Sequence, residues 1–128
     1  MTPHRLTLQP LHDVFAICRL QADEALPAWA TAKPFFSISR TGDELSIVCL
    51  QTLVPDGVRC ERGWRCFRVA GAMDFTMIGV VASLAGPLAA AGVSTFVVST
   101  FDTDYLLVKE QDWARAVATL RAAGHIVQ

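Results

Sequence analysis

The sequence predicts an α+β fold built from β-α-β-β-α-β units, and three observations support this prediction. Short runs rich in β-branched and aromatic residues, which are typical of strands, alternate with two helical patterns. Residues 92–110 form the pattern of a β-hairpin, with strands at 93–99 and 105–108 around a short polar turn. An earlier hairpin pattern, residues 36–48, aligns with residues 96–108, so the order β-α-β-β occurs twice.

The composition limits the possible functions. The chain has 128 residues, of which 52% are hydrophobic and 18% charged, which excludes a disordered chain. The net charge of −1 gives no basic surface, so we expect no nucleic-acid partner. The sequence begins without a secretory signal pattern, and we therefore expect a cytoplasmic protein.

One long uncharged stretch requires an explanation. No charged residue occurs from Phe75 to Phe101, and a membrane-spanning helix needs about 20 apolar residues. However, the stretch contains Gly86, Pro87 and Gly92, and its second part has a strand pattern. We interpret it as a buried helix followed by a buried strand, and we expect no membrane span.

The cysteines and histidines do not indicate a metal site. No two of the cysteines form a C-x-x-C pair, and the histidines do not lie near them in sequence. Two cysteines lie in strand-like runs and fit small core positions, and we expect reduced thiols in a cytosolic protein. The cysteines are Cys18, Cys49, Cys60 and Cys66, and the histidines are His4, His12 and His125.

The first half of the chain is predicted to be mainly strands. Asp23 can cap a short helical turn over residues 24–30, and Pro27 lies near its start, where proline is tolerated. Residues 54–63 contain proline and glycine and are expected to form a connector. The predicted strands are residues 6–8, 14–20, 35–39, 45–50 and 64–70.

The second half contains the main helices. Asp74 or Thr76 is expected to cap a helix from about Met77 to Ala91, and Pro87 should kink it by removing the bond to the Ser83 carbonyl. A further helix over residues 111–123 is closed by Gly124 and followed by a strand at 125–127. The apolar positions of the two helices are Met77, Val81, Leu84 and Leu88, and Trp113, Ala116, Val117 and Leu120.

The element order predicts two ferredoxin-like units side by side, each an antiparallel sheet with helices on one face. We expect the first unit to span residues 1–60 and the second residues 61–128. The first copy has a much shorter helix and no evident second one, so it is degenerate. Residues 6–8 can pair as an extra strand with the other unit. Edge strands of such sheets invite pairing, and we therefore expect a homodimer.

Two stretches resemble the ACT domain family of small-molecule sensors of amino-acid metabolism. They are residues 74–80, Asp-Phe-Thr-Met-Ile-Gly-Val, and residues 99–108, Ser-Thr-Phe-Asp-Thr-Asp-Tyr-Leu-Leu-Val. The whole chain is similar to small bacterial tandem ACT-domain proteins, which are related to the ACT pairs of the cytosolic arginine sensor family. The resemblance implies a non-catalytic regulatory sensor that binds an amino acid and needs no cofactor. Many ACT domains have Pro-Gly in the loop before the first helix, whereas this chain has Ile78-Gly79.

The chemistry of an amino acid suggests where it would bind. Unpaired N–H groups at the helix start, from Thr76 to Gly79, suit a carboxylate, and Asp104 or Asp102 can pair with the ammonium. Asp104 is the first choice because the repeat aligns it with another acid, Glu44. The predicted ligand-binding residues are Thr76, Met77, Ile78, Gly79, Ser99, Thr100, Asp102, Thr103 and Asp104.

Structural explanations compete with this site. Asp74 and Thr76 can act only as helix caps, Asp102 can close the turn, and Gly79 can allow close packing of helix on strand. The alternative function is a structural or protein-interaction module with a vestigial ligand pocket. The sequence contains no phosphate-binding glycine loop and no hydrolase or metalloprotease motif, so we do not expect an enzyme.

Overall fold

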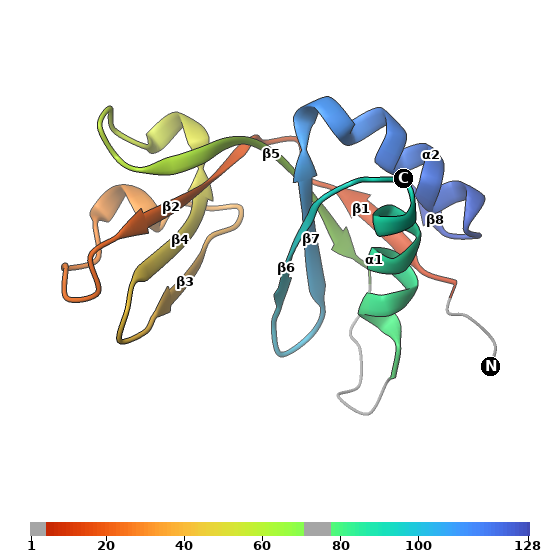
Figure 1. The fold of residues 1–128 in the computed structure, drawn as a ribbon, viewed down its shortest axis with the longest axis horizontal. Helices are drawn as coiled ribbons and strands as arrows, with labels where there is room; N and C mark the ends of the chain where they lie inside the picture. Colours follow the sequence, from red (N-terminus) through yellow and green to blue (C-terminus); the bar gives the residue numbers. More distant parts are fainter. Residues whose placement is uncertain (1–4, 71–77) are drawn as a thin grey trace. The chain divides into compact units, whose positions relative to one another are not determined.

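The computed structural model describes residues 5–70 and 78–128, and the chain divides into two compact units (Figure 1). The N-terminal unit is Asp13–Trp64. The C-terminal unit is Arg65–Gln128 together with Met1–His12. We expected a boundary near residue 60, with the first residues in the first unit, whereas the structure groups those residues with the last part of the chain.

The N-terminal unit has ferredoxin-like order with very short helices. Its strands are β2 (Phe15–Leu20), β3 (Ser37–Arg40), β4 (Leu45–Leu50) and the first part of β5 (Cys60–Val69), in the sheet order β3-β4-β2-β5. Two single 3₁₀ turns, η1 (Ala28–Ala30) and η2 (Gln51–Leu53), stand where the helices of a full unit would be. The predicted helical turn over residues 24–30 is therefore limited to its last three residues.

The core of the N-terminal unit lies under these turns, on one face of the sheet. Because side chains alternate across a strand, the residues that β2 and β4 contribute to this core come from every second position. The buried cluster is Ala16, Cys18, Ala30, Leu45, Ile47, Cys49 and Val54.

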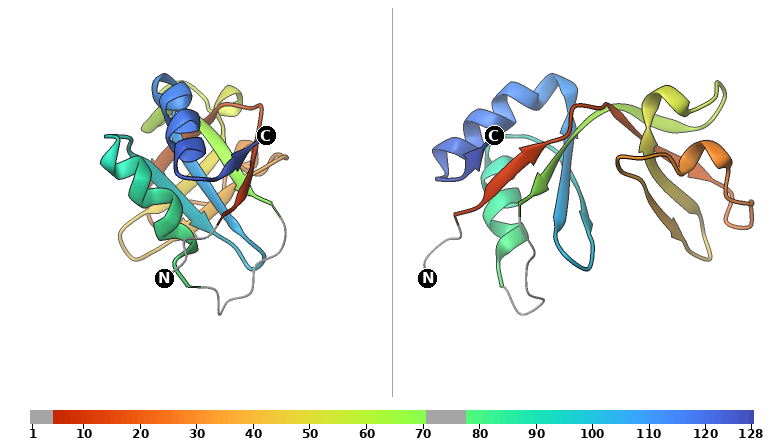
Figure 2. Two further views of the ribbon diagram at one scale, coloured as in Figure 1. Left: turned by 90° about the vertical axis from the view of Figure 1, so that its right-hand side faces the viewer. Right: turned by 180° about the vertical axis from the view of Figure 1, so that it is seen from behind.

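The C-terminal unit is the complete copy. After β5 come α1 (Val80–Ala90), β6 (Thr95–Ser99), β7 (Asp104–Lys109), η3 (Glu110–Asp112), α2 (Trp113–Ala122) and β8 (Ile126–Val127). Strand β7 pairs with both β5 and β6. The β-α-β-β-α-β order predicted from the sequence is thus present, with both helices on one face of the sheet (Figures 1 and 2).

A strand from the chain's beginning completes this sheet. Strand β1 (Thr7–Pro10) is antiparallel to the second half of β5, with Leu8 opposite Val69, and parallel to β8, with Leu8 opposite Val127. The prediction that residues 6–8 pair with the other unit is confirmed. Because β1 lies between β5 and β8, it is an interior strand, and Leu8 is fully buried.

Strand β5 serves both units, because it pairs with β2 up to Trp64 and with β1 from Phe67, and a bulge interrupts its pairing with β2. Ala16 of β2 faces two residues of β5, because Phe15 pairs with Trp64 and Ile17 with Glu61. Gly63, in this bulge, has a φ of 82°, which glycine adopts without a steric penalty. Its N–H donates to Oε1 of Gln51 at 2.6 Å. The sequence pattern predicted a connector up to residue 63, whereas β5 already begins at Cys60.

The core of the C-terminal unit joins both helices to the sheet. Trp113, at the start of α2, stacks on Phe67 with ring centroids 4.3 Å apart, and the Arg65 guanidinium lies 4.2 Å from the Trp113 ring. These contacts hold the first residue of α2 against β5. The buried residues are Leu8, Phe67, Val69, Leu84, Leu88, Val93, Leu106, Val108, Ala116, Leu120 and Val127.

Helix α1 begins at Val80, later than the predicted start near Met77. The proposed caps, Asp74 and Thr76, and the apolar position Met77 lie outside the described residues. Pro87 lies inside the helix, as predicted. Among the described residues, no helix combines the length and apolar character needed to cross a membrane.

Candidate functional site

The turn between β6 and β7 is closed by its own threonines. The N–H and the hydroxyl of Thr100 both donate to the carbonyl of Thr103, at 2.8 and 3.0 Å. The Thr103 N–H donates in return to the Thr100 hydroxyl at 3.3 Å. The Thr100 hydroxyl, which we predicted as a ligand contact, is thus engaged within the turn.

Thr103 also anchors the turn to the end of β5. Its side chain is 3% exposed, and its hydroxyl donates to the carbonyl of Val69 at 2.8 Å. Burial of a hydroxyl is costly without such a bond. The bond holds the turn, just before Asp104, against the last residue of β5.

Asp104 is a buried carboxylate at the hairpin end. It is 7% exposed, and Oδ1 accepts a short hydrogen bond from the Ser99 hydroxyl, which faces it across the strand pair. Carboxylates are rarely buried unless they are hydrogen-bonded or paired with a charge. Asp102, the second predicted acid, is exposed in the turn.

The start of α1 provides the second part of the candidate site. Gly79 is the N-cap residue with a φ of 82°, and its carbonyl accepts the N–H of Ser83 at 2.9 Å. In any α-helix the first N–H groups lack partners within the helix, and here they belong to Val80, Val81 and Ala82. Sequence reasoning placed these donors on Thr76 to Gly79, because it started the helix too early.

Gly79 has a conformational role that the sequence did not reveal. Among the described residues, a Cβ built on it would meet nothing within 4 Å, so close packing of helix on strand there does not require glycine at this position. The positive φ of Gly79 is what requires glycine, because a residue with a Cβ is sterically disfavoured at that φ. Of the remaining predicted residues, Ile78 is 79% exposed, and Thr76 and Met77 lie outside the described residues.

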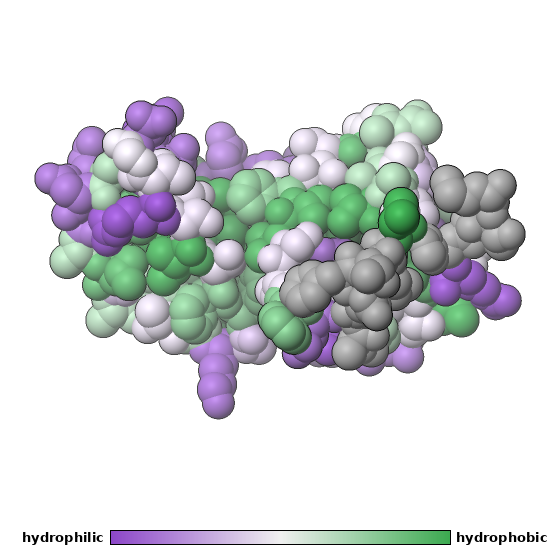
Figure 3. Space-filling model, turned by 90° about the horizontal axis from the view of Figure 1, so that it is seen from below, coloured by the Kyte–Doolittle hydropathy of each residue, from purple (hydrophilic) through white to green (hydrophobic). Residues whose placement is uncertain are grey.

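The start of α1 and the β6–β7 turn lie at the same end of the C-terminal sheet (Figures 1 and 2). Figure 3 shows the molecule from below, which is the side toward which the β6–β7 turn points in Figure 1. Hydrophobic residues, in green, are visible on that side. Two of the large exposed hydrophobic residues come from these two segments, Ile78 before α1 and Phe101 in the turn, at 79% and 78% exposure.

The hairpin of the N-terminal unit corrects the repeat alignment. Its turn has the same bonds, since the Thr41 N–H donates to the Glu44 carbonyl at 2.9 Å and the Glu44 N–H donates to the Thr41 hydroxyl. Thr41 therefore corresponds to Thr100, and Glu44 to Thr103. Asp104 then aligns with Leu45. Our prediction from the sequence, which aligned Asp104 with Glu44, is therefore wrong. The acid that both turns share is Asp43 in one and Asp102 in the other.

Helix α1 is held in place by a residue that sequence reasoning did not use. Pro87 has no N–H to donate to the Ser83 carbonyl, and Nε2 of His125 lies 3.0 Å from that oxygen. Nδ1 of His125 accepts the N–H of Leu6 at 3.1 Å, so the proton of the neutral ring is on Nε2. The sequence signal that could have indicated such a contact is the proline inside the helix, because it leaves the Ser83 carbonyl without its helical N–H donor.

No metal centre is seen in the part of the chain that the structure describes, because no three of its histidine, cysteine or acidic residues cluster as ligands would. His125, one of the histidines of the described chain, is 5% exposed and has both ring nitrogens hydrogen-bonded.

Comparison with known proteins identifies the family. The ACT domain model matches residues 59–122, which is half of the chain. The chain belongs to the ACT domain family. A second model, described as an N-terminal domain, matches residues 13–57, which lie within the N-terminal unit.

Two relatives show how far this ACT domain protein resembles others in sequence. The mouse cytosolic arginine sensor for mTORC1, subunit 1, is 35% identical over 91 residues, or 65% of this chain and 28% of that protein. The chain thus spans less than a third of that sensor's length. A crystal structure of a protein from Agrobacterium tumefaciens is 46% identical with a TM-score of 0.93, covering 98% of this chain and 93% of that one.

A more distant structure shares the fold alone. The regulatory subunit of aspartate kinase from Thermus thermophilus is 9% identical with a TM-score of 0.60, covering 87% of this chain and 93% of that chain. The ACT family supports a ligand-binding, regulatory role.

Proposed function

We propose that this protein is a non-catalytic regulatory module that binds a free amino acid at the end of the C-terminal sheet. The observation that carries the proposal is Asp104, a buried carboxylate at the same sheet end as the start of α1. The name of the mouse relative, an arginine sensor, also supports an amino acid as the ligand.

The chemistry follows from the two charges of an amino acid. Its carboxylate suits the N–H groups of the first turn of α1, where the helix dipole is positive. Its ammonium suits Asp104, because a carboxylate has about four acceptor positions and Ser99 occupies one of them. The remaining predicted contacts, Thr76 and Met77 among them, stay part of the proposed site.

A thermal-shift screen of the twenty amino acids and the common nucleotides tests the function. A ligand present at about 100 times its Kd should stabilise the protein by about 2.7 kcal/mol, since it binds only the folded state. An amino acid should raise the melting temperature and nucleotides should not. The absence of any shift would favour the alternative, an interaction module with a vestigial pocket.

Calorimetric titration of Asp104→Asn tests the site. Asparagine keeps an oxygen for Ser99 but removes the charge. We expect the affinity for the amino acid found by the screen to fall by about two orders of magnitude, since breaking a buried charge pair costs about 3–5 kcal/mol. Asp43→Asn, the same change in the turn of the N-terminal unit, is the control and should bind normally. Unchanged affinity in folded Asp104→Asn would remove Asp104 from the site.

We also propose that the protein is a homodimer. Within the described chain β6 pairs only with β7, so its other edge can pair with a second copy. Sedimentation velocity should show a dimer that dissociates on dilution. A monomer at every concentration would contradict the proposal.

A further inference from the structure

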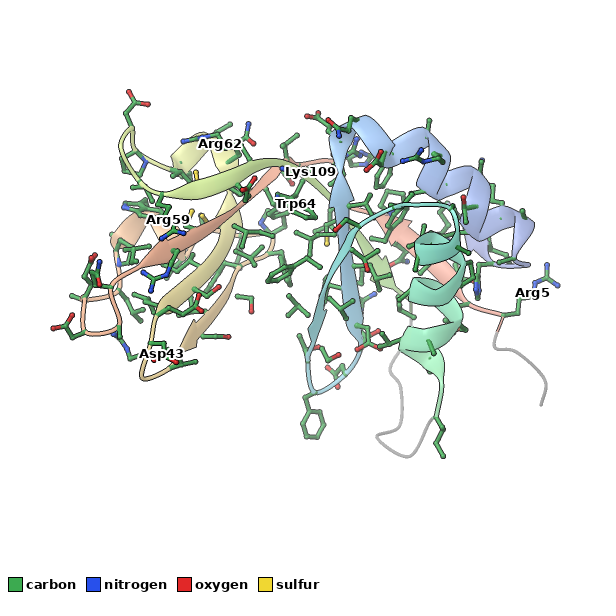
Figure 4. All side chains as sticks on the ribbon, viewed as in Figure 1. Arg5, Asp43, Arg59, Arg62, Trp64 and Lys109 are labelled. Carbon is green, nitrogen blue, oxygen red and sulfur yellow. The ribbon has the colours of Figure 1, made fainter. Side chains whose placement is uncertain are left out.

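Three thiols meet on one face of the N-terminal sheet, far in sequence from the ligand site. Cys18 is on β2, Cys49 on β4 and Cys60 on β5, which are neighbouring strands in the order β4-β2-β5. Cys18 and Cys49 are 1% exposed and belong to the core cluster, against which the half-buried Cys60 packs. Figure 4 shows sulfur atoms, in yellow, in this unit, where Arg59 and Arg62 are labelled.

Cys18 and Cys60 lie directly opposite each other in the antiparallel β2–β5 pair. The N–H of Arg19 donates to the carbonyl of Arg59 at 2.9 Å, so Arg19 and Arg59 form a hydrogen-bonded pair. Because such pairs alternate along an antiparallel ladder, Cys18 and Cys60 form a non-hydrogen-bonded pair, whose Cα atoms are about 4.5 Å apart. That spacing lies within the range of about 4.4–6.8 Å found for disulfides.

Cys49 is not in the same position. Its partner across the β2–β4 pair is Ala16, so Cys18 is a diagonal neighbour. Diagonal neighbours are about 7–8 Å apart, beyond the reach of a disulfide without backbone movement. Geometry therefore selects Cys18 and Cys60 as the pair that can be joined.

Electrostatics and access distinguish the roles of the three thiols. The hydrogen bond between Cys18 and Cys49 raises the pKa of Cys18 and lowers the pKa of Cys49. Cys18 therefore keeps its proton. Cys49 is buried, so a reagent in solution cannot reach it. Burial raises the pKa of Cys60, while the nearby Arg62 guanidinium opposes this. Cys60 is the thiol with access to solvent and is therefore the first to react.

We propose that Cys18 and Cys60 form a reversible disulfide by exchange with a low-molecular-weight disulfide such as oxidised glutathione. The Cys60 thiolate attacks one sulfur of the small disulfide, breaking its S–S bond and releasing one thiolate, which takes up a proton. The Cys18 sulfur then attacks the Cys60 sulfur of the mixed disulfide, and the second small thiolate leaves. The proton that Cys18 loses in this step passes to that departing thiolate.

The overall change oxidises two protein thiols and reduces one small disulfide to two thiols. A disulfide across a non-hydrogen-bonded pair links two strands that already pair, so it forms without unfolding the unit. Since Cys60 must first lose its proton, exchange is slow at neutral pH and becomes faster as the pH rises.

The test uses the folded full chain and oxidised glutathione. After incubation, the protein is quenched with acid, alkylated and measured by intact mass and peptide mapping. The four free thiols should fall to two, with Cys18 linked to Cys60, and a dithiol should restore all four. Cys66→Ser is the matched control, because Cys66 is buried in the other unit and burial raises its pKa to about 12.

The variants separate the steps. Cys18→Ser should stop at the mixed disulfide and gain one glutathionyl group on Cys60. Cys60→Ser should remain unmodified, and Cys49→Ser should still form the disulfide, because Cys49 is not one of the joined pair. Four free thiols in the oxidised wild-type protein, a disulfide that includes Cys49, or loss of the disulfide in Cys66→Ser would each overturn the proposal.

Discussion

At the scale of single residues, His125 supplies the hydrogen bond to the Ser83 carbonyl that Pro87 cannot make. The proline deprives the Ser83 carbonyl of its helical donor, and the buried histidine supplies a replacement from after α2. Through its other nitrogen, His125 also binds the backbone of Leu6, just before β1. A single side chain therefore connects α1 to the start of β1.

We predict that His125→Phe lowers the free energy of unfolding by about 2–3 kcal/mol, because the Ser83 carbonyl and the Leu6 N–H both lose a partner. Chemical denaturation measures this change. In a Pro87→Ala background the cost should be about 1 kcal/mol smaller, since the N–H of the introduced alanine can donate to the Ser83 carbonyl. Equal costs in both backgrounds would contradict the pairing of His125 with Pro87.

The acids of the hairpin show what residue types alone could predict. Their position at the end of a strand pair was predictable from the turn-forming residues around them. Their different environments were not, because the burial of Asp104 depends on Ser99 across the ladder and on the anchoring of Thr103 to Val69. Neither contact has a signal in the sequence.

At the scale of elements, the β6–β7 hairpin is attached to β5 by one side chain. The Thr103 hydroxyl reaches the carbonyl of Val69, which is the last residue of β5. This bond joins the hairpin turn to the strand that leads toward α1, and so it contributes to the shape of the candidate ligand site.

We predict that Thr103→Val destabilises the protein by about 1–3 kcal/mol, because valine has the same shape but leaves the buried Val69 carbonyl without its donor. Urea denaturation is the measurement. Thr95→Val, the same substitution on the edge strand β6, serves as the control and should change stability by less than about 0.5 kcal/mol. Equal effects of the two substitutions would exclude a special role for the Thr103 bond.

The helix boundaries were harder to predict than the strands. The apolar spacing over residues 77–91 indicated a helix, but its start at Val80 depends on the positive φ of Gly79. Helix α2 was predicted closely, because Trp113 and Leu120 are on its apolar face and Gly124 follows it with a φ of 97°. Glycine after a helix is a local signal, whereas glycine before a helix has several explanations.

At the scale of the whole molecule, the two ends of the chain meet in the C-terminal sheet. Strand β1 lies between β5 and β8, and Leu8 is fully buried in the core. The stability of residues 65–128 therefore depends on a strand from the first twelve residues of the chain.

We predict that a chain beginning at Asp13 loses more than about 3 kcal/mol of stability in the C-terminal unit, from the burial of Leu8 and the ladder bonds of β1. Hydrogen exchange should show faster exchange in β8 and the second half of β5. Strands β2 and β4, which belong to the other unit, should keep their protection. Unchanged exchange in β8 would show that β1 does not support this sheet.

The sequence by itself determined the strands, the two main helices and the double β-α-β-β order, because these depend on local patterns of apolar side chains and turn-forming residues. The tertiary structure alone decided three further features: the sharing of β5 between two units, the parallel pairing of β1 with β8 and the meeting of three cysteines. Each depends on which strands pair and in what register, and here the paired strands come from segments that lie far apart in the chain. Strand pairing brings together residues that are far apart in the chain, such as Cys18 and Cys60. No local sequence pattern therefore predicts that these residues meet.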